Sequence, residues 1–326
     1  AAATLHDASA NANHSKILTV AGAIFAAFAG DSLVVGNYIK FFKYNLANIG
    51  DDPIELVLPG KHERILCTSA NRLLSTRSPF AHYVISTSRT VHWWDPNDAQ
   101  FGSKSINLEA TDVRCTDMTK NGSHALIKYQ HPNSGRFCAK VLDLNTGSFI
   151  GKDAKGMPCS MSSAPKFSHV GKNIVLVKGN ELQLWSPITQ KFFKKVALKM
   201  TEATHVACSP DGRSLVILGY HGTNWMERRQ QLQIFNLFDQ KFEKDFGELF
   251  PSSKIPFNLG RISNDGRYAL TASRSTVLVL DLRTHKLAAK IELAGHSEIT
   301  SVDISGDGKF VFANADAVHV WKRWEA

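Results

Sequence analysis

Short apolar runs separated by tight turns recur along the chain, and the pattern is clearest in residues 254–326. Two segments there share an apolar run, an Asp-Gly pair, a second apolar run and a third run that ends in a bulky residue. The pairs Asp265-Gly266 and Asp307-Gly308 are 42 residues apart. Because glycine tolerates positive φ, each pair favours a tight turn between two strands. The pattern predicts three short strands in each repeat.

Strand triplets repeated every ~40–45 residues are typical of β-propeller blades. We expect the third strand of each blade to end in a bulky residue, at Phe42, Trp94, Leu142, Trp185, Phe235, Leu280 and Trp321. Outer strands should follow at Ile54–Leu58, Ser105–Leu108, Ser148–Ile150, Lys191–Leu198, Lys241–Phe246 and Lys286–Leu293. Only five residues follow Trp321, so we expect Ser15–Val20 to supply the last outer strand.

These strands predict an all-β fold, a seven-bladed β-propeller closed by an N-terminal outer strand. Residues 15–326 would form this single propeller, and residues 1–14 would be a flexible N-terminal segment or a remnant of processing. A closed propeller is the architecture that fits a chain of this length into one domain.

The last repeat resembles the WD-repeat family, with Gly295-His296 before its first strand and Trp321 at the end of its third. The resemblance implies a buried structural network of His296, Asp316 and Trp321. Ala313 or Ala315 stands where the family has Ser or Thr, which indicates a divergent member. It gives Trp94 and Trp185 the structural position of Trp321 in their own blades. The usual role of the family, docking other macromolecules, becomes the expected function.

Composition indicates a soluble globular chain, with 43% hydrophobic and 21% charged residues. The formal net charge of +9 favours acidic partners, among them acidic peptide segments, RNA and acidic lipid headgroups. The clearest basic run, Lys191–Lys199, is interpreted as an outer strand whose lysines guard a sheet edge. Five cysteines without a Cys-x-x-Cys pair favour reduced thiols in the cytoplasm or nucleus. The apolar run 17–29 resembles a signal-peptide core but is too short to cross a membrane, so we expect no transmembrane segment.

One motif suggests an enzyme. Gly30-Asp31-Ser32-Leu33 resembles the nucleophile block of the Gly-Asp-Ser-Leu esterases, and the resemblance implies a triad of Ser32, Asp316 and His319. That fold needs helices between parallel strands, and no amphipathic helix is evident, so we interpret Gly30-Asp31 as an ordinary turn. The 13 histidines do not fall at metal-ligand spacing, and no phosphate-binding loop occurs. We therefore expect no enzymatic activity, cofactor, metal or small-molecule substrate.

An unusually long connection, 220–231, is the best candidate for a docking surface, because two to five residues would join its strands. Aromatic side chains, methionine and arginine there are typical of interaction surfaces: Tyr220, His221, Trp225, Met226, Arg228 and Arg229. A shorter loop should open on the same face with His131 and Arg136, and the loop before blade two with His62 and Arg64. We expect a non-catalytic docking scaffold for proteins within a larger assembly. One alternative is a basic propeller that binds RNA or acidic lipid headgroups, and another is that Trp225 packs against its own blade.

Overall fold

The computed structural model describes the strands and most of the turns that join them. The described residues are 3–5, 14–21, 25–29, 32–36, 41–48, 51–56, 65–70, 83–87, 89–94, 104–119, 122–151, 156–159, 165–168, 173–209, 213–222, 229–239, 241–245, 259–263, 267–273, 275–293, 298–305 and 308–323. Every regular element in these residues is a β-strand. The strands pair antiparallel into seven sheets, which fall into two compact units. The expectation of an all-β chain is confirmed.

The first unit holds three sheets, built from both ends of the chain. One sheet contains β3 (Phe25–Ala29), β4 (Ser32–Gly36), β5 (Phe41–Asn45) and β6 (Ile54–Leu56). A second contains β24 (Leu259–Ile262), β25 (Tyr268–Ser273), β26 (Thr276–Asp281) and β27 (Lys286–Glu292). The third has the order β1-β2-β30-β29-β28 and joins β1 (Ala3–Leu5) and β2 (His14–Ala21) to β28 (Ser301–Ile304), β29 (Phe310–Asn314) and β30 (Ala317–Arg323).

The second unit holds four sheets, each with its first four strands in chain order, and in one of them a fifth strand, β15, also pairs with β13. The first contains β7 (Ile65–Ala70), β8 (Tyr83–Thr87), β9 (Thr90–Trp94) and β10 (Lys104–Asn107), and the second contains β11 (Thr111–Met118), β12 (His124–Gln130), β13 (Phe137–Asp143), β14 (Ser148–Phe149) and β15 (Met157–Cys159). The third contains β16 (Lys166–Phe167), β17 (Ile174–Lys178), β18 (Glu181–Ser186) and β19 (Lys191–Ala197), and the fourth contains β20 (Glu202–Cys208), β21 (Ser214–His221), β22 (Arg229–Asn236) and β23 (Lys241–Asp245).

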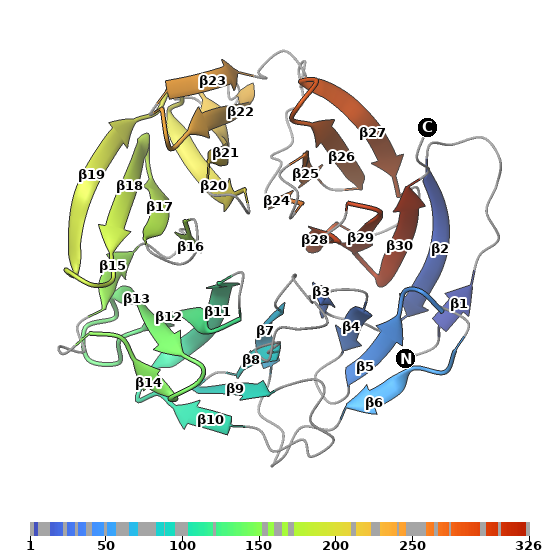
Figure 1. Cartoon of the computed structure of the whole chain (residues 1–326), viewed down its shortest axis with the longest axis horizontal. Helices are drawn as coiled ribbons and strands as arrows, with labels where there is room; N and C mark the ends of the chain where they lie inside the picture. The colour runs from blue at the N-terminus through green and yellow to red at the C-terminus, as the bar shows by residue number, and fades with distance from the viewer. Residues whose placement is uncertain are drawn as a thin grey trace. The chain divides into compact units, whose positions relative to one another are not determined.

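The N-terminal segment forms two strands. β2 pairs with β30 in the register Val20↔Val318, and β1 adds to the outer side of β2 with Ala3 opposite Val20 (Figure 1). Part of the segment 1–14 that was expected to be flexible is therefore a strand. It pairs because the outer side of β2 presents main-chain hydrogen-bonding groups that an extended segment can satisfy.

The third strands end at or just beyond the expected bulky residue in six sheets, and β5 differs. It continues past Phe42 to Asn45, and Tyr44 is the buried residue next to its end. The Asn45 side chain accepts a 3.0 Å hydrogen bond from the Ala47 amide and so caps the following turn. The prediction that this strand ends at Phe42 was wrong by three residues, because turn chemistry set the end rather than side-chain size.

A hydroxyl closes the turn between the first and second strands in four sheets. Each accepts a hydrogen bond of 2.9 to 3.0 Å from an amide five residues later, in the pairs Thr119 with His124, Ser209 with Ser214, Ser263 with Tyr268 and Ser305 with Phe310. These residues lie just before the Asn-Gly or Asp-Gly pairs. The turn therefore needs both a residue that tolerates positive φ and a hydroxyl latch.

Four strands, β19, β23, β27 and β2, carry a one-residue β-bulge at a shared position. The register of the third strand against the fourth skips Phe193 in β19, Glu243 in β23 and Ala288 in β27. β2 skips Ile17 where it pairs with the end of β30. A bulge of this kind bends a strand and increases its twist.

Apolar faces of neighbouring sheets pack to form the core within each unit. In the first unit, Trp321 packs with Tyr268 and Leu270, and Leu18 and Val20 pack with Phe28 and Val320. In the second unit, Trp185 packs with Leu126 and Met157. Trp93 lies in a cluster with Val113 and Leu142, and it is almost completely buried. The buried tryptophans join one sheet to the next.

Candidate functional site

The hairpin between β12 and β13 presents residues 131–136 to solvent, and all six are exposed. The His131 amide donates a 2.8 Å hydrogen bond to the Arg136 carbonyl oxygen, and the Gly135 amide donates a 2.9 Å bond to the His131 carbonyl oxygen. Gly135 has a φ of 63°, which explains the choice of glycine at this place in the turn. The loop therefore has a defined backbone and exposes the His131 and Arg136 side chains.

Gln130 fixes the base of this loop. Its Nε2 donates a 3.0 Å hydrogen bond to the Gly135 carbonyl oxygen, and its Oε1 accepts a 3.4 Å bond from the Thr111 hydroxyl on β11. Nearby on β11, the Arg114 guanidinium lies 2.8 Å from the Asp112 carboxylate. In this ion pair the positive charge of Arg114 is balanced by the negative charge of Asp112. Arg136 is an exposed cation of the 131–136 loop.

The hairpin between β21 and β22 begins with Tyr220 and His221, which pair with Gln230 and Arg229. Tyr220 is half-buried and His221 is exposed. The Tyr220 carbonyl oxygen accepts a 2.7 Å hydrogen bond from the Thr201 amide, and the Thr201 hydroxyl accepts a 3.0 Å bond from the Gly222 amide. The connection from β19 to β20 thus fixes the position where the long loop leaves the sheet.

Gly219 allows this close approach. A Cβ atom at position 219 would lie 2.2 Å from the Glu202 carbonyl oxygen and 2.5 Å from Met200 Sδ. No side chain fits at these distances without moving the β20 backbone, so glycine is required where β21 passes under the connection. The direction in which the 220–231 loop leaves the sheet therefore depends on a residue outside the loop.

The turns between second and third strands lie at one end of the sheets of the second unit. The Ala203 amide donates to the Gly179 carbonyl oxygen at 2.7 Å, which places the β17–β18 turn beside the connection that holds Tyr220. The Leu108 amide donates to the Arg89 carbonyl oxygen at 2.8 Å, which places the β8–β9 turn beside the connection that leads into β11. We call the hairpins 130–137 and 220–230 at this end the docking loops.

Several of the predicted docking residues lie outside the described residues. These are His62, Arg64, Trp225, Met226 and Arg228, and for Arg229 the structure gives the strand position alone. Their role as partner contacts remains a prediction.

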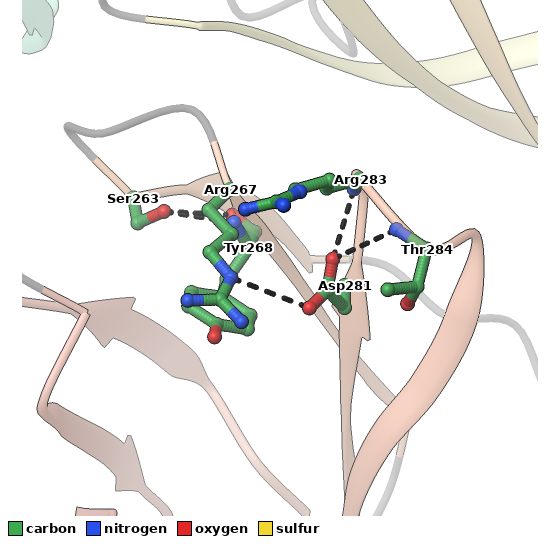
Figure 2. A network of polar contacts seen from close by, with 6 residues as sticks. All are labelled: Ser263, Arg267, Tyr268, Asp281, Arg283 and Thr284. Carbon is green, nitrogen blue, oxygen red and sulfur yellow. Dashed lines mark hydrogen bonds and ion pairs between the residues drawn. The ribbon is translucent and has the colours of Figure 1, made fainter. Parts of the chain in front are cut away.

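Polar residues cap the turns between third and fourth strands. Asp281 Oδ1 accepts hydrogen bonds from the Arg283 amide at 2.9 Å and the Thr284 amide at 3.0 Å (Figure 2). Its Oδ2 lies 3.3 Å from Arg267 Nε. Burial raises the pKa of Asp281, but the Thr284 and Arg283 amides and the Arg267 guanidinium outweigh it and leave that pKa below its ordinary value.

Equivalent caps occur in other sheets. The Asn236 side chain accepts hydrogen bonds from the Phe238 and Asp239 amides, and the Asp143 side chain accepts one from the Asn145 amide. Sequence reasoning missed these caps and the hydroxyl latches. Their signal is present, since an Asx or hydroxyl residue stands at the same place in successive repeats.

The structural residues expected from the family resemblance have different environments. Trp185 and Trp321 are buried, Trp94 ends β9, and His296 lies outside the described residues. Asp316 is exposed rather than buried, and its Oδ1 lies 3.6 Å from Nε2 of the buried His319. The other ring nitrogen of His319, Nδ1, lies 3.3 Å from the Thr19 hydroxyl on β2. Asp316 thus contacts a histidine three residues along the chain.

Among the residues that the structure describes, no group of three or more His, Cys, Asp or Glu side chains is arranged to hold a metal ion. The same residues include no helix of the length and apolarity that would cross a membrane.

The sequence matches no protein-family model and no curated protein. The fold, however, is similar to the crystal structure of the Cps50 (Swd1) β-propeller domain from Myceliophteria thermophila, with a TM-score of 0.67. The sequences are 12% identical over 93% of this chain and 98% of that domain. The protein therefore has a β-propeller fold. The WD-repeat-like propeller predicted from the sequence is confirmed at the level of the fold.

Proposed function

We propose that the protein is a non-catalytic docking platform for other proteins, working inside the cell as part of a larger assembly. The observation that carries the proposal is the 131–136 loop, whose backbone is held by its own hydrogen bonds while all its side chains are exposed. Pre-organised exposed side chains lose little conformational entropy when a partner binds. A fold alone does not specify a function, so the proposal rests on this surface.

The docking loops supply the contacts in this proposal. Arg136 and the arginines at 228 and 229 can each make bidentate contacts with carboxylates, and Trp225 can serve as an apolar anchor. Gly219 and the Thr201 contacts hold one end of the longer loop. Acidic protein segments are the favoured partners, because the chain carries a net charge of +9.

We also propose that the seven sheets are the blades of one ring spanning residues 15–326, closed by β2 as the outer strand of the last blade. The position of the bulge supports this role, because β2 skips Ile17 against β30 where β27 skips Ala288 against β26. β2 thus takes up the register of an outer strand.

The geometry of His319 supports a non-catalytic role for the Ser32, Asp316 and His319 set. The ring of His319 is 1% exposed, and its two nitrogens face Thr19 and Asp316. In such a triad the histidine must take the proton of the serine hydroxyl through a ring nitrogen. His319 instead joins β30 to β2.

Capture of partners from the native source tests the docking proposal. The full chain would be compared with two variants. The loop variant combines His131→Ser, Arg136→Ser and Trp225→Ala, and the control variant carries Asn145→Ser, in the turn at the other end of β13. We expect the loop variant to lose its protein partners and the control to keep them, with equal melting temperatures. Equal capture by all three chains would contradict the proposed docking face. Nucleic acid in place of protein, released steeply by salt, would favour the RNA-binding alternative.

A further inference from the structure

The outer edge of β19 differs from the other outer strands. In the described part of the chain, β19 is the last strand of its sheet and pairs with β18 on one side (Figure 1). It is seven residues long, and exposed and half-buried residues alternate along it. A strand in this position presents main-chain amide and carbonyl groups along its outer edge, which can pair with another extended segment.

The charge of β19 is one-sided. Its sequence contains Lys191, Lys194 and Lys195 and no carboxylate. Lys195 Nζ lies 3.5 Å from Glu181 on β18. By comparison, β23 contains two lysines, one glutamate and one aspartate, and in β27 a lysine and a glutamate form an ion pair of 2.6 Å. By residue content, β19 therefore carries three positive charges and no negative one, whereas β23 is balanced and β27 has one lysine in excess.

Exposed apolar side chains lie along the same edge. Phe193, at the bulge, is 53% exposed, whereas the equivalent positions in β23 and β27 hold Glu243 and Ala288. Ile188, in the turn that leads into β19, is 84% exposed. Apolar surface next to a strand that contains lysines and no carboxylate suits a ligand that is both acidic and apolar.

The chain itself shows that an outer strand of this fold accepts a further strand. β1 adds to the outer side of β2, with Ala3, Thr4 and Leu5 opposite Val20, Thr19 and Leu18. Three residues suffice for this pairing in the first unit. The longer edge of β19 offers the same main-chain pattern with a stronger charge bias.

We propose that the outer edge of β19 binds an extended acidic segment of a partner protein by strand addition. Carboxylates of the segment would contact Lys191 and its neighbours, and an apolar residue would cover Phe193 and Ile188. A second copy of this chain is a poor occupant, because pairing two β19 edges would bring like charges together. The surface is separate from the docking loops, so it adds a second contact to the proposed docking function.

A fluorescent ten-residue peptide of alternating glutamate and valine is a suitable probe for the full chain. We expect saturable binding in fluorescence anisotropy, weakened about tenfold by Lys191→Glu and by Phe193→Ser. Lys286→Glu is the matched control, because Lys286 occupies the same register position in its outer strand as Lys191. Lys286 of β27 lies opposite Asp281 of β26, and Lys191 of β19 lies opposite Ser186 of β18. Binding to this control should be unchanged.

Methylation of alternate peptide nitrogens removes the donors that strand addition requires. On the wild-type protein the methylated peptide should fail to bind, and this arm does not depend on the folding of any variant. Equal binding of the methylated peptide would overturn strand addition, and equal binding to Lys191→Glu would overturn the site. Binding of a single-stranded RNA oligonucleotide as tight as that of the peptide, or no peptide binding at about 1 mM, would also overturn the proposal. Partner capture through the docking loops is measured separately and can persist in any of these cases.

Discussion

The indole Nε1 of Trp93 donates a 2.8 Å hydrogen bond to the main-chain carbonyl oxygen of Leu144. Trp93 belongs to β9 and Leu144 follows β13, so the bond joins two neighbouring sheets of the second unit. Gly147, in the same turn, has a φ of 70°, and a Cβ there would lie 3.4 Å from Cζ2 of Trp93. The indole thus fills the space that the turn leaves open.

Replacing Trp93 tests this junction. We expect Trp93→Phe to lower the free energy of unfolding by about 2 kcal/mol or more, because the Leu144 carbonyl loses its donor and a cavity forms. Gly147→Ala should also destabilise, and its cost should be smaller in the Trp93→Phe background, which lacks the indole atoms that Cβ approaches. Chemical denaturation of the two single variants and the double variant measures this coupling. Additive effects would show that Gly147 acts through its φ alone.

The N-terminal strands should contribute strongly to stability. Deletion of residues 1–21 removes β1 and β2, and with them the buried Leu18 and Val20, each worth ~1.5–3 kcal/mol. It also uncovers Val318 and Val320 on β30. We expect a clear fall in melting temperature, whereas deletion of residues 1–13 removes β1 and should have a small effect. If the chain 22–326 had the same melting temperature as the full chain, β2 would not be an outer strand.

Asp281 should make stability depend on pH in the acid range. Its pKa is lowered in the folded protein, so its contribution is fully present above the unfolded pKa of about 3.9 and is lost as pH falls through the folded value. Asp281→Asn should keep the amide cap, as Asn236 does, and lose the Arg267 ion pair.

Thermal melting from neutral to acid pH measures this difference. We expect the wild-type protein to have a higher melting temperature than Asp281→Asn near neutral pH, and we expect the two melting temperatures to converge as the pH falls below about 4. Asp281→Ala should be less stable than Asp281→Asn by about 1 kcal/mol throughout, because it also loses the cap. A gap between wild type and Asp281→Asn that does not change with pH would refute a role for the Asp281 charge.

Hydrolysis of short-chain esters tests the structural role given to His319. We expect Ser32→Ala to leave any trace activity of the purified protein unchanged. We expect His319→Ala to lower the melting temperature, because its ring is buried between Thr19 and Asp316. Ester hydrolysis that disappears in both variants would identify a hydrolase instead.

The sequence predicts the hairpins well because local chemistry specifies them. Asp265-Gly266 and Asp307-Gly308 each follow a first strand, and the residues before them, Ser263 and Ser305, latch the turn. Such turns require particular residue types within five positions, so a single sequence reveals them.

Features that depend on distant neighbours could not be predicted. The sequence repeat points to Trp94, whereas the packing of Trp93 beside Leu142 depends on the neighbouring sheet. Likewise, β1 is a strand because β2 offers it an edge. The length and residue types of the docking loops can be predicted from the sequence. The need for Gly219, next to one of these loops, cannot, because it arises from the close approach of the Glu202 backbone.

The shared bulge leaves one position without a cross-strand partner in each of β19, β23 and β27. The residues at this position differ in chemistry: an aromatic ring in Phe193, a carboxylate in Glu243 and a methyl group in Ala288. The preceding residues are all apolar, namely Phe192, Phe242 and Leu287. A residue that opposes no partner can be exchanged without disturbing the ladder on either side. Substitution there can therefore vary the character of a sheet's outer rim and leave its scaffold intact. A cysteine at 243, which is exposed, would also be a convenient attachment point for a spectroscopic probe.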